Sequence, residues 1–108
     1  MPAIHVTEAE SAILEALWRH GSLPPARLIA EVKAQRAWGE ATIKTLLGRL
    51  MHKKAVRSER VEGLVRYRPL IERAAYVEGE VGLLVDRLFD GDRAALARFL
   101  AELNPGAS

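Results

Sequence analysis

The chain has 108 residues, 49% of them hydrophobic, and a formal net charge of +2. This length fits one small domain, or a domain with an appendage, and the composition is that of a folded protein. The lack of cysteine excludes disulfides, thiolate metal sites and thiol catalysis. No apolar run approaches the ~20 residues that a membrane span needs, so we expect a cytoplasmic protein without a membrane partner.

The charge is distributed unevenly along the chain. Residues 1–70 hold twelve Lys/Arg and seven Asp/Glu, a net +5, whereas residues 71–108 hold four and seven, a net −3. A basic region of this kind predicts a polyanionic partner, and the acidic region should point away from it. We therefore expect a nucleic-acid-binding domain over residues 1–70 and a separate segment over residues 71–108.

Two scaffold helices are predicted before residue 36. The sequence Thr7-Glu8-Ala9-Glu10 is a capping box that predicts a helix start, and Gly21 is suited to end that helix. Pro25 fits the first position of a second helix, which should end near Gln35. Apolar residues at helical spacing give both helices one buried side, and Trp18 is expected to lie in the core.

A third helix is predicted from Glu40, and its two faces differ sharply. One face carries a continuous apolar stripe, made by Ile43, Leu46, Leu47, Leu50 and Met51. The opposite face is small and polar, with Thr45 near its centre. A face of hydroxyls and cations without bulky apolar groups is suited to a groove edged by phosphates.

After this helix the sequence changes period. β-favouring residues at 55–56 and 64–67 bracket Glu62-Gly63, which predicts a short antiparallel hairpin. Two helices, a short turn, a third helix and a basic hairpin make a winged helix-turn-helix, so the predicted fold is mainly α.

Residues 44–68 carry eight basic and two acidic side chains, a net +6 that predicts contact with double-stranded DNA. We expect the helix threonines and Lys44 to approach base edges, and Lys53 and the arginines to hold phosphates. The predicted DNA-binding residues are Thr42, Lys44, Thr45, Arg49, Lys53, Arg60, Arg66 and Arg68. An alternative reading of the same charges is a winged helix that docks on an acidic protein.

Beyond residue 70, apolar residues keep a helical spacing until Asp90-Gly91-Asp92 interrupts it, and Asp92 can cap a last helix. An arm of 38 residues is too small to bury these stripes within itself, so it either folds back or pairs with a second copy. Recognition of an inverted repeat in DNA requires two-fold symmetry, which favours pairing with a second copy. The expected dimerisation residues are Val77, Val81, Leu84, Val85, Leu88, Phe89, Leu96, Phe99 and Leu100.

Signs of catalysis are missing from the sequence. The three histidines, at positions 5, 20 and 52, lie on separate segments without carboxylates at ligand spacing. No phosphate loop follows a strand and no serine stands in a nucleophile motif. We expect a protein that is not an enzyme and that needs no metal, no cofactor and no small-molecule ligand.

The stretch from Trp38 to Leu50, WGEATIKTLLGRL, resembles the recognition helix of the penicillinase-repressor family (BlaI/MecI/CopY type). Residues 7–10, 62–70 and 89–100 are similar to that family's opening helix, wing and C-terminal dimerisation segment. The resemblance implies a homodimeric transcriptional repressor that binds an inverted-repeat operator through two winged helices. Two departures are notable, because Lys54 stands where a glycine usually ends the recognition helix and the cysteines of copper-responsive members are missing.

Overall fold

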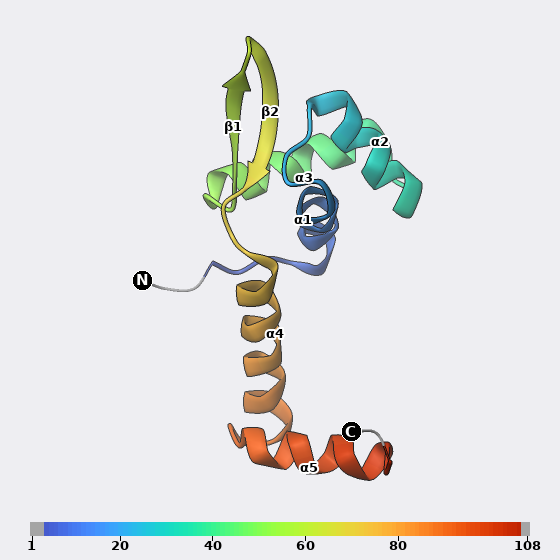
Figure 1. The fold of residues 1–108 in the computed structure, drawn as a ribbon, viewed down its shortest axis with the longest axis vertical. Coiled ribbons are helices and arrows are strands. Elements are labelled where there is room, and N and C mark those ends of the chain that lie inside the picture. Colours follow the sequence, from blue (N-terminus) through green and yellow to red (C-terminus); the bar gives the residue numbers. More distant parts are fainter. Residues whose placement is uncertain (1–3, 107–108) are drawn as a thin grey trace. The chain divides into compact units, whose positions relative to one another are not determined.

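The computed structural model describes residues 4–106, which form five helices and one two-stranded hairpin (Figure 1). The elements in chain order are α1 (Glu8–His20), α2 (Pro25–Gln35), α3 (Glu40–His52), β1 (Val56–Val61), β2 (Leu64–Pro69), α4 (Arg73–Leu88) and α5 (Arg93–Leu103). The chain divides into two compact units, the first ending at Arg73 and the second beginning at Ala74. Within residues 4–106 no helix combines the length and the apolar character that crossing a membrane requires.

Local signals set both ends of α1. The Thr7 hydroxyl accepts a hydrogen bond from the Glu10 backbone N–H at 3.1 Å, and the Glu10 carboxylate accepts one from the Thr7 N–H at 3.0 Å. These reciprocal bonds confirm the predicted capping box. At the other end Gly21 has φ 84°, a conformation that glycine adopts without steric cost, and its N–H donates to the Leu17 carbonyl.

The core of the first unit lies between α1, α2 and α3. Each helix contributes one apolar side, and the fully buried large side chains include Ile13, Leu14, Leu17, Leu28, Ile43 and Leu50. The predicted stripe of α3 is buried except for Met51, which is 37% exposed because it lies at the edge of the stripe. Trp18 is only half-buried, and its indole N–H donates to the Ile71 carbonyl at 2.8 Å.

The hairpin confirms the predicted wing. Strands β1 and β2 pair antiparallel from Val56 with Pro69 to Val61 with Leu64, leaving Glu62 and Gly63 as a two-residue turn. Both turn residues have positive φ, 54° and 80°, as the tight turns that match strand twist require. A short bridge from Leu23 to Tyr67 fastens the α1–α2 connection to β2. The first unit is therefore a winged helix.

Lys54 closes the end of α3 in the place of a glycine. Its φ is 63°, and its N–H donates to the Met51 carbonyl at 3.1 Å. The next N–H, from Ala55, reaches back to the Leu50 carbonyl at 2.8 Å. This pair of bonds is a Schellman motif, which glycine normally completes because a side chain disfavours positive φ.

The second unit consists of α4 after its first residue, a tight turn and α5. Asp90 and Gly91 both have positive φ, and the Asp92 carboxylate accepts from the Ala95 N–H at 3.2 Å, which starts α5 as predicted. The rings of Phe89 and Phe99 lie 5.9 Å apart. Among the described side chains of this unit, Val85 alone is buried. The arm leaves most of its apolar surface exposed.

Candidate nucleic-acid interface

The outward face of α3 is polar and accessible. Thr42, Lys44, Thr45 and Arg49 are all exposed, while the apolar stripe on the other side of the helix is buried in the core. Gly48 lies on the same face, and a Cβ built there would meet nothing within 4 Å. The sequence therefore orients these side chains away from the protein, on an outward helix face that carries no bulky apolar group.

Lys44 is lightly held. Its ammonium lies 3.6 Å from the carboxylate of Glu40, one turn earlier, and both side chains are more than half exposed. Exposed pairs of this spacing contribute only a few tenths of a kcal/mol. A phosphate or a base edge can therefore compete for Lys44 at little cost in stability.

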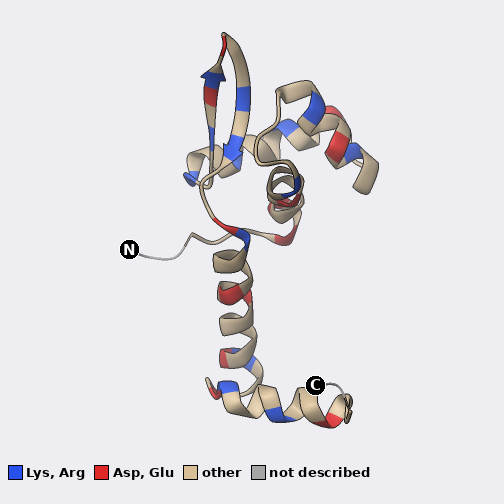
Figure 2. Ribbon diagram, in the orientation of Figure 1, with Lys and Arg blue, Asp and Glu red and all other residues tan. Residues whose placement is uncertain are grey.

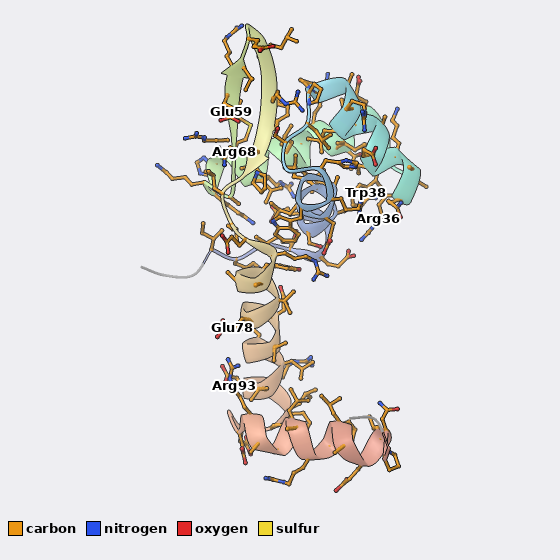
Figure 3. All side chains as sticks on the ribbon, in the orientation of Figure 1. Arg36, Trp38, Glu59, Arg68, Glu78 and Arg93 are labelled. Atoms are coloured by element: carbon orange, nitrogen blue, oxygen red, sulfur yellow. The ribbon has the colours of Figure 1, made fainter. Side chains whose placement is uncertain are left out.

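The hairpin carries a cluster of charges around Glu59 (Figures 2 and 3). The Glu59 carboxylate lies 3.3 Å from the Arg57 guanidinium and 3.7 Å from that of Arg68, which faces Arg57 across the strands. Arg60 donates to the Gly63 carbonyl at 3.1 Å and so lies against the turn. Arg57 was not among the predicted contacts, although the basic run of the sequence included it.

Arg66 is half-buried and bonded within the protein. Its Nε donates to the Ser22 hydroxyl at 3.0 Å and its Nη2 donates to the Ser22 carbonyl at 3.2 Å. The guanidinium has five N–H donors, so three are left for other acceptors. Arg66 therefore joins β2 to the connection before α2 and keeps a fixed orientation.

Lys53 is also bonded within the protein. Its ammonium donates to the Glu10 carboxylate at 2.5 Å and to the His5 carbonyl at 3.0 Å. Glu10 is 1% exposed. Burial by itself raises the pKa of Glu10, but the hydrogen bonds from Lys53 and Thr7 outweigh burial and hold the pKa below its usual value. Lys53 thus ties the end of α3 to the start of α1, and its role in DNA binding stays a prediction.

A second contact fixes the connection between α2 and α3. The guanidinium of Arg36 lies over the Trp38 ring, 5.0 Å from its centroid, and it also pairs with Glu8 (Figure 3). The hydrogen bond from Arg36 is the main cause that lowers the pKa of Glu8. This ion pair joins residues 28 positions apart, a separation at which no sequence pattern signals a contact.

The three histidines, all in the described part of the chain, do not belong to a metal-binding cluster. Across residues 4–106 no three His, Asp or Glu side chains gather as they would around a metal ion. The Nε2 of His20 lies 3.4 Å from Glu31, near the end of α1.

Comparison with known proteins gives a consistent result. The family model described as penicillinase repressor matches residues 6–106. The penicillinase repressor of Bacillus licheniformis is 27% identical over 86 residues, which cover 80% of this chain and 67% of that protein.

Two solved structures resemble the winged helix. The B. licheniformis BlaI monomeric form in complex with the blaP half-operator has a TM-score of 0.63 and 28% identity, covering 70% of this chain and 94% of that one. The CopR repressor structure has a TM-score of 0.50 and 34% identity, covering 63% and 99%. With a family model that matches nearly its whole length, the chain belongs to the penicillinase repressor family of winged-helix transcriptional regulators.

Proposed function

We propose that the protein is a transcriptional repressor that binds an inverted-repeat operator as a homodimer. The observation that carries this proposal is the outward polar face of α3, with Thr42, Lys44, Thr45 and Arg49 exposed beside a basic hairpin. The B. licheniformis BlaI relative, solved in complex with a half-operator, shares this fold, which supports DNA as the partner. Such a repressor acts where the chromosome is, in the cytoplasm.

The proposed contacts divide into two classes. Thr42, Lys44 and Thr45 approach base edges in the major groove, because hydroxyls and a cation on a narrow helix face can reach them. Basic side chains around this helix hold phosphates and set its position without reading sequence, and these are Arg49, Lys53, Arg60, Arg66 and Arg68. Lys53 and Arg66 do so while keeping their internal bonds.

The arm is the part of the chain that binds the second copy in this proposal. Its exposed apolar side chains include Leu84, Leu88, Phe99 and Leu100, all at least 37% exposed. A second arm that covers them would bring two winged helices to two half-sites. Val85 is already buried within its own unit, so we leave it out of the proposed contact surface. Blocking pairing would weaken operator binding, because one winged helix has about half the phosphate contacts.

The division of contacts is tested by two substitutions. Thr45→Val keeps the shape of the side chain and removes its hydroxyl, so it should reduce preference for the operator with little change on random DNA. Arg68→Ala should weaken binding to both DNAs alike and lower the dependence of log K on log salt by about one. The measurement is an equilibrium titration of fluorescent DNA from the upstream region of the gene, at several salt concentrations. Equal effects of the two substitutions on both DNAs would contradict the proposal.

A further inference from the structure

A shallow apolar hollow flanked by opposite charges lies on α4. Its lining is formed by Glu80, Val81, Leu83, Leu84 and Arg87. Glu80 and Arg87 are seven residues apart, which puts them two turns apart on the same side of the helix. Leu83 and Leu84 lie between them and are 56% and 37% exposed. The hollow therefore has an acidic end, an apolar centre and a basic end.

The two flanking charges lack partners along their own helix. Within α4, the residues three and four positions from Glu80 are Tyr76, Val77, Leu83 and Leu84, and those at the same spacing from Arg87 are Leu83 and Leu84, none of which is charged. Asp90 follows Arg87 by three positions but lies beyond the end of α4 at Leu88. In the described part of the chain neither Glu80 nor Arg87 forms an ion pair. On α2 and α3, by contrast, helix neighbours four residues apart pair at 3.3 and 3.6 Å.

We propose that this hollow is covered by the same hollow of a second copy, with the two α4 helices antiparallel. Glu80 of each protomer then faces Arg87 of the other, and the two-fold axis passes beside Leu83 and Leu84. This inference rests on the proposed homodimer and defines the register in which it forms.

Symmetry makes the pairing self-complementary. In a two-fold interface, residue i of one copy meets residue j of the other and the reverse contact forms as well. The midpoint between residues 80 and 87 falls between Leu83 and Leu84, so the exposed leucines meet at the axis while both charge pairs close. A parallel arrangement would set Glu80 against Glu80 and Arg87 against Arg87, which repel.

Charge reversal tests the register on the full chain without DNA. In the antiparallel dimer E80R sets Arg against Arg87 twice, and R87E sets Glu80 against Glu twice. Each single variant should raise the dimer dissociation constant about tenfold or more, measured by sedimentation equilibrium. The double variant E80R/R87E, and an equimolar mixture of the two single variants, should regain most of the affinity of the parent chain. D86R is the matched control, because it lies about 120° around the helix from Glu80 and should leave the constant unchanged.

The outcomes separate two failures. A parent chain that is monomeric at all concentrations overturns the proposed homodimer and this register together. A dimeric parent whose single variants dissociate no more readily than the parent or D86R overturns the register alone. The register is also overturned if the single variants dimerise weakly and neither the double variant nor the mixture regains the affinity of the parent chain. Nonspecific damage to the surface would give that result. Circular dichroism of each variant confirms that the helices are intact.

Discussion

The two units of the molecule differ in how much of their apolar surface they bury by themselves. In the winged helix, α1, α2 and α3 enclose side chains such as Leu14, Leu28 and Leu50 completely. In the arm, Val85 is the one buried side chain among the described residues, and Leu103 remains 59% exposed. A unit with a closed core folds on its own, whereas a unit without one gains stability only when another surface covers it. The winged helix therefore has the core it needs to fold alone, and the open apolar surface of the arm is the reason we propose that the arm pairs with a second copy.

The largest expected effect comes from the core of the winged helix. Leu50→Ala should lower the free energy of unfolding by about 3 kcal/mol, because it removes a fully buried side chain and leaves a cavity. Urea unfolding at one fixed protein concentration measures this loss. Leu103→Ala, at a position 59% exposed, is the control and should change the unfolding of the winged helix by less than about 0.5 kcal/mol. Similar losses from both substitutions would erase the distinction between the units.

The next effect comes from the bond between Lys53 and Glu10. Glu10→Gln removes the negative charge that pairs with the Lys53 ammonium. It should lower the free energy of unfolding of the winged helix by about 2 kcal/mol. The pKa of Glu10 is lowered in the folded state, so its contribution is present above the unfolded pKa of about 4.5 and is lost as pH falls through the folded value.

Unfolding midpoints measured between pH 7 and pH 3 test this linkage. The parent chain should lose stability below about pH 4.5 more steeply than Glu10→Gln does. The two pH profiles would be parallel if the carboxylate of Glu10 carried no stabilising charge.

In the arm the effect should appear as association rather than folding. Leu100→Ala, at a position 50% exposed in α5, should raise the dimer dissociation constant about tenfold, because covering the exposed halves of the two Leu100 side chains contributes roughly 1.5 kcal/mol per dimer. Sedimentation equilibrium measures it. Leu64→Ala, an exposed leucine of the hairpin, should leave the constant unchanged. An arm that folds without a partner would give no difference between these two variants.

The elements of the winged helix could be predicted because their signals are local. The capping box of Thr7 and Glu10, the proline at position 25 and the Glu62-Gly63 turn each act within four residues, and each has the predicted structure. The outward face of α3 was also predictable, because helix periodicity fixes which side the apolar stripe occupies. The predicted burial of Met51 was wrong, because this residue lies at the margin of that stripe.

The internal bonds of the candidate interface could not be predicted. Lys53 meets a residue 43 positions away, and Arg66 meets one 44 positions away. A basic residue in a DNA-binding segment has the same sequence signature whether it is free or bonded within the protein. Only the packing of α1 against α3, and of the hairpin against the α1–α2 connection, decides which cations are already held. Which residues contact DNA and which contact a second copy stay predictions.

The smallest expected effect is a gain, and it arises at the junction of α3 with the wing. Lys54 holds φ 63° in a Schellman motif that suits glycine, so Lys54→Gly should raise the free energy of unfolding by up to about 1 kcal/mol. Glycine also makes the unfolded chain more flexible, which offsets part of that gain. Gly21→Ala, at φ 84°, is the reverse control and should lower stability. Because the strain lies in the first unit, urea unfolding should change while the dimer dissociation constant does not. A loss of stability in Lys54→Gly would show that the lysine side chain supports the junction through contacts that outweigh its backbone strain.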